Sequence, residues 1–406
     1  MPRYSSDTHV HVETLSRQPE PDGVLVGRKD TATFLLLPVE AVEILDDLAS
    51  GLTVGEAQRR YLERHGETPD MEDLLTTVEA HGFVRPATGD AGAVTARKYH
   101  FEWISPRWAR RFFGPVTLTA GALLALLAAA AVAFEPSIVP GWRAAYFPAN
   151  TAAGLLFLMV TGLFTTFLHE MGHVVAARAR GVSCRFAIGS QLWFLTWETD
   201  MTGIWALPRR QRYLPLLGGP LVDVFSASVL VVFFFAGARG WVSADPAILQ
   251  FGRALLFIYL MRVLWQCYFF LRTDFYYVFS NLLGCRRLMH DTEDFLRNVR
   301  ARLFRRPGPA IDQSHIAPRE QRMIRIYSGV WLIGRALAFL LLVFIQLPLL
   351  YHYLMLLVDR VRNGAPAGSA GDSLMPMIAA IFFALFFLSG MGLWLRQLWF
   401  RKGSSV

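Results

Sequence analysis

Long apolar stretches separated by short basic segments dominate the sequence from residue 115 onward. Six of these stretches have about 20 mostly apolar residues each, the length at which a helix crosses the hydrocarbon core of a bilayer. Basic residues flank alternate ends of the stretches, so the positive-inside rule places both termini in the cytosol. The predicted spans cover residues 115–134, 151–180, 213–238, 247–271, 326–350 and 376–395.

The first ninety residues follow a different pattern of short apolar runs. Residues 1–22 are polar, which predicts a disordered tail and no secretory signal. Two apolar runs at residues 24–26 and 33–37 predict a hairpin, and three amphipathic helices and a short returning strand follow. We therefore predict a small α+β winged-helix domain over residues 23–90.

The rest of the chain divides by polarity. An aromatic and basic belt follows the N-terminal domain, and an irregular stretch at residues 182–205 predicts either a hairpin at the membrane edge or a plain connecting loop. The fold class is thus mainly α: a polytopic membrane protein with about six transmembrane helices plus the winged-helix domain. The segments are a linker and interfacial segment at 91–114, a membrane core at 115–285, a cytosolic basic segment at 286–325 and a C-terminal transmembrane pair at 326–406.

Composition and charge agree with this division. The chain has 406 residues, of which 53% are hydrophobic, and this excludes an ordinary soluble enzyme. Residues 1–90 contain 17 acidic and 8 basic residues, a net charge of −9, whereas the remainder has a net charge of +17. An acidic domain repels phosphates, so nucleic acid is not an expected partner, while the basic remainder suits the bilayer of the cell membrane.

The sequence HEMGH at residues 169–173 is the candidate chemical centre. On a helix, His169 and His173 project from nearly one face and can share one metal ion. Glu170 lies beside the first histidine, where its carboxylate can deprotonate a metal-bound water. The alternative is a chance match in which the histidines pair with neighbouring helices. Because such polar residues are costly within a membrane-length apolar helix, we favour a Zn²⁺ hydrolase site.

A catalytic zinc ion needs a third protein ligand, and two aspartates in the later spans are candidates. His169 lies near the cytosolic end of its span, and Asp274 lies at the cytosolic end of another. Asp223 is about ten residues inside its span, on the order of 15 Å deeper. Depth therefore favours Asp274 as the ligand and leaves Asp223 as an auxiliary group or a rival.

Residues 115–285 resemble the site-2 protease family of intramembrane zinc metalloproteases, and more closely its peptide zinc metalloprotease branch. The resemblance rests on HEMGH, on WALPRRQR at residues 205–212, on GGP at 218–220 and on DFYY at 274–277. It implies a zinc metalloendopeptidase with an Asp as third ligand, a place that Asp274 takes. Phe275 stands where the family usually has Gly, and Asp223 where it often has Asn.

Residues 23–85 resemble the winged-helix leader-peptide-recognition domains typified by the peptide chaperone of pyrroloquinoline quinone biosynthesis. The resemblance rests on the hairpin, on LPVEAVEILDDLASGLTV and on LLTTVEAHGFV. It implies that an extended peptide adds to the hairpin edge, through Val24, Val26, Phe34 and Leu35. The alternatives are a structural cap and a winged helix that binds nucleic acid.

Together these features predict a protease that cleaves a peptide precursor, removing the leader of a ribosomally synthesised, post-translationally modified peptide. One alternative is regulated intramembrane proteolysis of a membrane-anchored signalling protein. Another is a non-enzymatic component of peptide export or immunity. The expected partners are the precursor peptide and the lipid bilayer, and the sequence predicts no oligomeric state.

Overall fold

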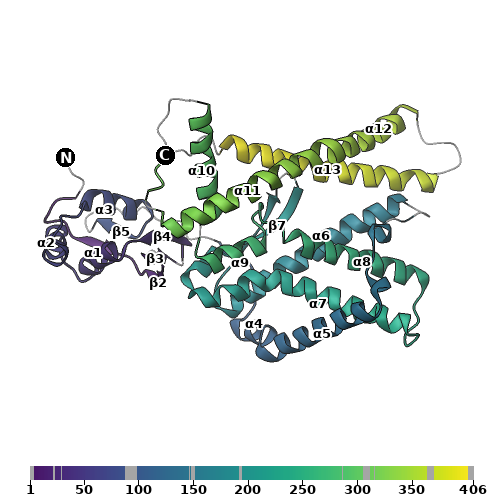
Figure 1. Cartoon of the computed structure of the whole chain (residues 1–406), viewed down its shortest axis with the longest axis horizontal. Helices are drawn as coiled ribbons and strands as arrows, with labels where there is room; N and C mark the ends of the chain where they lie inside the picture. Colours follow the sequence, from purple (N-terminus) through teal and green to yellow (C-terminus); the bar gives the residue numbers. More distant parts are fainter. Residues whose placement is uncertain are drawn as a thin grey trace. The chain divides into compact units, whose positions relative to one another are not determined.

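The computed structural model of the protein describes residues 4–21, 23–28, 30–86, 98–145, 147, 151–191, 194–285, 287–304, 311–314, 316–363 and 370–400. The described chain is mostly helical, with strands near its N-terminus and one later hairpin, β6–β7 (Figure 1). It forms two compact units. The first comprises Met1–Glu102, Val182–Arg185 and Met201–Tyr213, and the second comprises Trp103–Gly181, Phe186–Asp200 and Leu214–Val406. The first residues of the predicted linker, 91–97, lie outside the described residues.

Five short strands form two small sheets in the first unit. β1 (Val10–Val12) pairs with β5 (Val84–Pro86). β2 (Ser16–Glu20), β3 (Gly23–Arg28) and β4 (Thr33–Leu37) form an antiparallel sheet in that order. The predicted hairpin is β3 and β4, and the predicted returning strand is β5.

The prediction of a disordered tail over residues 1–22 is wrong for residues 10–20, which contain β1 and β2. The five residues of β2 pair in register with β3, so their backbone groups gain ladder hydrogen bonds that do not depend on an apolar pattern. Consequently Val24 and Val26 lie on the central strand of the sheet, whereas Phe34 and Leu35 lie on β4, which ends the sheet within the described chain.

Three helices cover the sheets of the first unit: α1 (Val39–Ala49), α2 (Val54–His65) and α3 (Met71–Ala80). A capping box between Thr53 and Glu56 begins α2, where both residues satisfy backbone donors at the helix start. The helices and sheets share one apolar core. Its most buried side chains are Val26, Leu45, Leu48, Ala57, Leu75, Val78 and Phe83.

A buried ion pair ties β2 to the segment that leads into α7 (Tyr213–Ala238). The Nη2 atom of Arg212 lies 2.6 Å from Oε1 of Glu20, and the two side chains are only 1% and 4% exposed. Arg212 also donates to the carbonyl oxygens of Leu207 and Trp205 and stacks on the Trp205 ring. Residues 201–213 are therefore an integral part of the first unit.

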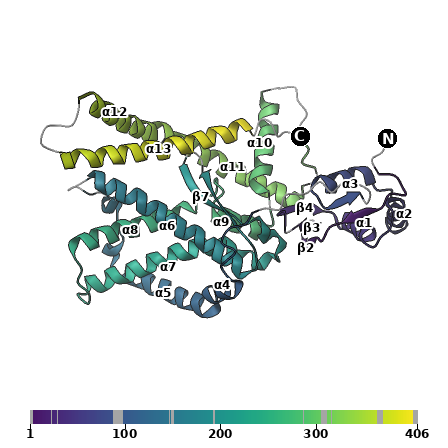
Figure 2. The same cartoon turned by 180° about the vertical axis from the view of Figure 1, so that it is seen from behind.

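The second unit contains ten helices among the described residues, together with most of the hairpin of β6 (Arg185–Gln191) and β7 (Phe194–Asp200). This hairpin agrees with the one predicted at residues 182–205. Figure 2 shows from the opposite side that α6 and α7 run side by side. Besides α7, the helices are α4 (Pro106–Phe112), α5 (Pro115–Phe134), α6 (Thr151–Ala179), α8 (Pro246–Trp265), α9 (Asp274–Leu283), α10 (Leu288–Leu303), α11 (Pro318–Leu341), α12 (Leu347–Asn363) and α13 (Ala370–Phe400).

Four helical segments within the described chain are long and apolar enough to cross a membrane. They are Pro106–Phe134, Arg209–Ala238, Pro246–Trp265 and Pro318–Gln346. A shorter apolar helical stretch, Ala384–Arg396, lies in α13. By length and composition, this is the helix content of a membrane protein.

Three predicted spans have different boundaries in the structure, and one of them, predicted at 376–395, lies within the longer α13. The span predicted at 247–271 ends as α8 at Trp265. The next residue, Gln266, accepts two hydrogen bonds from the start of α9. The Thr273 hydroxyl donates to its backbone carbonyl, and the Asp274 N–H donates to its side-chain oxygen. The span predicted at 326–350 begins eight residues earlier, at Pro318, a residue suited to the first helical turn. A π-helical segment then joins α11 to α12.

Glycines allow α6 and α7 to approach each other closely. A Cβ atom built on Gly172 would lie 2.5 Å from the carbonyl oxygen of Gly218, and one built on Gly218 would lie 2.5 Å from that of Gly172. Such distances are impossible for a real side chain, so both positions require glycine. Small residues at helix contacts are the usual means of close packing within membranes.

We predict that Arg212→Met strongly destabilises the protein, because it leaves the buried Glu20 carboxylate without its counter-ion. Breaking a buried pair costs about 3–5 kcal/mol. The measurement is the apparent melting temperature of the purified full chain in detergent. The matched control is Arg17→Met, which breaks the partly exposed pair with Asp46 and should cost less than about 1 kcal/mol. Equal shifts in the two variants would contradict the structural role of the buried pair.

Candidate metal centre

The two histidines of α6 are buried and each is fixed through its Nδ1 atom. Nδ1 of His173 lies 2.8 Å from the carbonyl oxygen of Pro215, and Nδ1 of His169 lies 2.7 Å from Oδ2 of Asp223. A carbonyl oxygen only accepts, so the neutral His173 ring carries its proton on Nδ1 and presents a lone pair on Nε2. An ionised Asp223 selects the same tautomer for His169. The two Nε2 atoms are 3.3 Å apart.

Asp274 meets both histidines from the start of α9. Its Oδ2 lies 3.0 Å from Nε2 of His169, and its Oδ1 lies 3.1 Å from Nε2 of His173. The Asp274 backbone N–H donates to the Gln266 side chain at 3.0 Å, and Thr273 caps the helix.

The geometry of these three side chains suits one metal ion. In a tetrahedral zinc site with bonds of about 2.0–2.1 Å, neighbouring ligand atoms lie about 3.3 Å apart. The two Nε2 atoms are 3.3 Å apart, and they lie 3.0 and 3.1 Å from the two different oxygens of the Asp274 carboxylate. Two neutral imidazoles and a carboxylate are also a donor set that zinc prefers. The residues present therefore fit the ion that the sequence led us to expect.

Asp223 occupies a different position from Asp274. It is fully buried on α7 and contacts the Nδ1 side of His169, away from the Nε2 atoms. Its other oxygen lies 3.3 Å from Nη1 of Arg262 on α8. Arg262 also donates to the carbonyl oxygen of Gly162 and to the hydroxyl of Thr165. Asp223 is thus placed to orient a ligand histidine, the usual role of a carboxylate in the second layer of a zinc site.

Because Gly219 has no side chain, the space beside the Nε2 atoms of His169 and His173 stays open. A Cβ atom at this position would lie 2.4 Å from Nε2 of His169 and 2.5 Å from Nε2 of His173. Any side chain here would enter the space between the donor atoms. This explains in physical terms why two consecutive glycines precede Pro220: Gly218 serves helix packing, and Gly219 serves the site.

Glu170 lies on the same helix and belongs to the same cluster. One oxygen of its carboxylate and one ring nitrogen of each of His169 and His173 all lie within 4.8 Å of one another. Its backbone carbonyl accepts a hydrogen bond of 3.4 Å from the Thr199 hydroxyl on β7. Glu170 is therefore close enough to exchange a proton with a molecule held at the histidines.

The structure brings together five of the residues that the sequence singled out. His169, Glu170, His173, Asp223 and Asp274 form one cluster in the second unit. The four residues assigned to peptide binding lie in the first unit, on β3 and β4.

Sequence reasoning missed three groups that support this cluster. Arg262 neutralises Asp223, Gln266 holds Asp274, and the Pro215 carbonyl fixes His173. Only Arg262 had a usable signal, since a charged residue inside an apolar span marks a functional position. A side-chain amide and a backbone carbonyl leave no comparable signal in the sequence.

Comparison of the chain with models of known protein families, with curated proteins and with solved structures gave no match.

We predict that Gly219→Ala removes bound metal, because the added methyl group would occupy the space between the two Nε2 atoms. The measurement is zinc per chain in the purified full-length protein, with an expected fall of at least tenfold. Gly121→Ala on α5 is the matched control, since a Cβ atom there meets nothing within 4 Å. Full zinc content in Gly219→Ala would show that the ion does not lie where these nitrogens converge.

Proposed function

We propose that the protein is an intramembrane zinc metalloendopeptidase of the site-2 protease type that cleaves a peptide precursor. The observation that carries the proposal is the convergence of both Nε2 atoms and the Asp274 carboxylate, with Glu170 beside them. We further propose six transmembrane spans, adding those in α6 and α13 to the four found, with both termini in the cytosol.

The charge of the site supports a divalent cation. Arg262 contributes one positive charge, and Asp223, Asp274 and Glu170 contribute three negative charges, which leaves the cluster at −2 when both histidines are neutral. An uncompensated charge is costly within an apolar surrounding. A zinc ion held by His169, His173 and Asp274 would bring the formal charge of the cluster to zero.

In the proposed reaction a water molecule attacks the carbonyl carbon of a peptide bond. Bound zinc would supply a Lewis acid, which makes a water acidic near neutral pH and polarises a carbonyl oxygen. Glu170 takes the proton from the attacking water on its carboxylate and passes it to the nitrogen of the leaving amine. Asp223 and the Pro215 carbonyl keep the histidine protons on Nδ1 throughout, so both Nε2 atoms stay available.

The first unit is the proposed recognition domain for the leader of the precursor. Its sheet and three helices are compatible with a winged helix, and it is acidic. β2 contains Pro19, which lacks a backbone donor, so this edge of the sheet is poorly suited to pair with another strand. β4 has no proline and carries the partly exposed Leu35 and Leu36. We therefore propose that the peptide pairs with β4, which contains Phe34 and Leu35. Val24 and Val26 lie on the central strand β3 and would not contact the added strand through their backbone.

The zinc site is tested by three substitutions in the purified full chain. Asp274→Ala should lose zinc and cleavage together, because it removes a ligand. Asp223→Asn should keep zinc with an affinity weaker by about 10–100-fold, the usual effect of a second-layer change. Glu170→Gln should keep zinc while lowering cleavage of a random peptide library by at least about 100-fold, because it removes the base.

Two results would contradict this assignment. If Asp223→Asn loses zinc and Asp274→Ala retains it, Asp223 is the third ligand and Asp274 the supporting residue. Unchanged zinc in a His169→Ala/His173→Ala double variant would remove the metal centre altogether. Zinc without Glu170-dependent cleavage would favour the non-enzymatic role in peptide export or immunity.

The recognition domain is tested by placing proline on either edge of its sheet. Leu36→Pro on β4 should raise the KM for a candidate precursor peptide, because Leu36 lies in the next row of the register, where β4 presents its N–H to an added strand. Arg17→Pro on β2 is the matched control and should leave the KM unchanged. The zinc content of both variants should stay at the wild-type level. Equal KM values for the two variants would refute recruitment through β4, and the regulatory alternative would then be preferred.

A further inference from the structure

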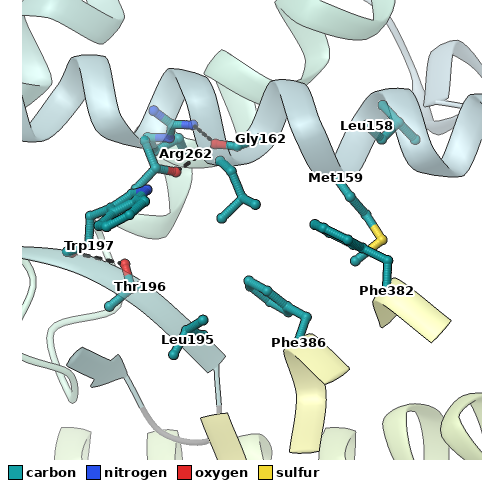
Figure 3. A pocket seen from close by; sticks show the side chains of 11 residues that line it. Leu158, Met159, Gly162, Leu195, Thr196, Trp197, Arg262, Phe382 and Phe386 are labelled. Carbon is teal, nitrogen blue, oxygen red and sulfur yellow. Dashed lines mark hydrogen bonds between the residues drawn. The ribbon is translucent and has the colours of Figure 1, made fainter. Parts of the chain in front are cut away.

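A cavity of about 240 Å³ lies in the second unit, and its lining includes Arg262, the ion-pair partner of Asp223. Residues of α6, β7, α8 and α13 line it. Figure 3 shows Met159 and Gly162 of α6 on the side opposite Phe382 and Phe386 of α13, with Arg262 near Trp197. Pockets that hold whole drug-sized ligands measure about 300–1,000 Å³. This cavity is smaller and suits one part of a larger molecule.

The cavity and the metal centre share one face of α6. Gly162 and Thr166 line the cavity, and they precede His169 and His173 with spacings of four, three and four residues, which form a single helical stripe. At 1.5 Å per residue, Thr166 lies about 4.5 Å and Gly162 about 10.5 Å from His169 along the helix axis. β7 spans the same interval, since Trp197 lines the cavity and Thr199 bonds to Glu170.

The lining selects an apolar occupant. It is mostly leucine, methionine and aromatic side chains, and the charge of Arg262 is already balanced by Asp223 at 3.3 Å. An anionic group would therefore find no uncompensated cation here. The buried indole N–H of Trp197 has no hydrogen-bond partner among the described residues. Because β7 lines the cavity through Trp197 and bonds to Glu170 through Thr199, a substrate side chain is a better-placed occupant than a lipid acyl chain.

We infer that this cavity is a specificity subsite that receives a large apolar side chain of the peptide substrate. An extended peptide advances about 3.3 Å per residue, so an occupant 4.5–10.5 Å from His169 belongs to a residue one to three positions from the bond that is cut. The inference rests on the proposed function and adds the class of side chain that the same site selects: leucine, methionine or phenylalanine rather than alanine, glycine or a charged residue.

Gly162→Leu is the test variant, because it adds a side chain at a residue that lines the cavity. A Cβ atom on Gly162 meets nothing within 4 Å, and leucine is a better helix former than glycine. The matched control is Gly121→Leu on α5, where a Cβ atom also meets nothing within 4 Å. Both full-length variants are incubated with a random peptide library, and the cleavage sites are identified by mass spectrometry.

The wild type and Gly121→Leu should prefer a large apolar residue at one position within three of the cut. Gly162→Leu should lower that preference by about 10-fold or more, the scale on which a hydrophobic pocket discriminates, and should still cut peptides with alanine there. Phe386→Ala enlarges the cavity and should move the preference toward larger side chains. An absent preference in the wild type, or the same preference in all variants, would overturn the inference.

A binding measurement separates this inference from the proposed function. Short peptides ending in a metal-binding hydroxamate, with alanine or leucine as the neighbouring residue, are titrated into Glu170→Gln by calorimetry. The leucine peptide should bind at least tenfold more tightly, and adding Gly162→Leu should abolish the difference. Equal affinities would overturn the inference even if cleavage is observed. If a lipid co-purifies with the wild type but not with Gly162→Leu, and the peptide selectivity of the two is the same, the cavity binds an acyl chain and the inference is wrong.

Discussion

The contact between the backbones of α6 and α7 determines the geometry on which the whole centre depends. Because Gly172 and Gly218 have no side chains, the two helices can approach within a distance that any Cβ atom would prevent. This approach brings the Pro215 carbonyl and Asp223 to the Nδ1 atoms of the two histidines. A slightly wider separation would leave these imidazoles without fixed tautomers, and their Nε2 atoms would not face one space.

The centre also shows how polar groups can be accommodated inside an apolar protein. Arg262, Asp223, His169 and Asp274 form a continuous series of contacts across four helices. Each member contacts the next, so each of these buried polar groups has a polar partner. The cavity beside Arg262 can consequently remain apolar in character although a guanidinium group lines it.

The sequence predicted much of this arrangement, and its failures have physical reasons. The helix with HEMGH, the span of α7 and the three helices after the first hairpin were predicted closely, because each depends on local spacing or periodicity. β2 was missed, since its pairing with β3 stabilises a strand that has no apolar pattern.

The residues of the candidate metal centre were predicted, but the groups that support them were not. Helical spacing and depth suffice to group His169, His173 and Asp274, because both follow from the length of regular elements. The contacts of Gln266, Pro215 and Arg262 depend on how separate helices meet, and this is a tertiary property. The open space beside Gly219 is likewise a tertiary property, because it depends on how α6 and α7 meet.

The composition of the first unit has a consequence for the order of folding during synthesis. Its buried Glu20 is translated early, but the Arg212 that neutralises it follows almost two hundred residues later. At about 5–20 residues per second, the ribosome needs roughly 6–20 s to extend the chain from residue 102 to residue 213. Two of the proposed membrane spans are made in that interval. The N-terminal unit therefore remains incomplete until those spans have left the ribosome, which couples its maturation to membrane insertion.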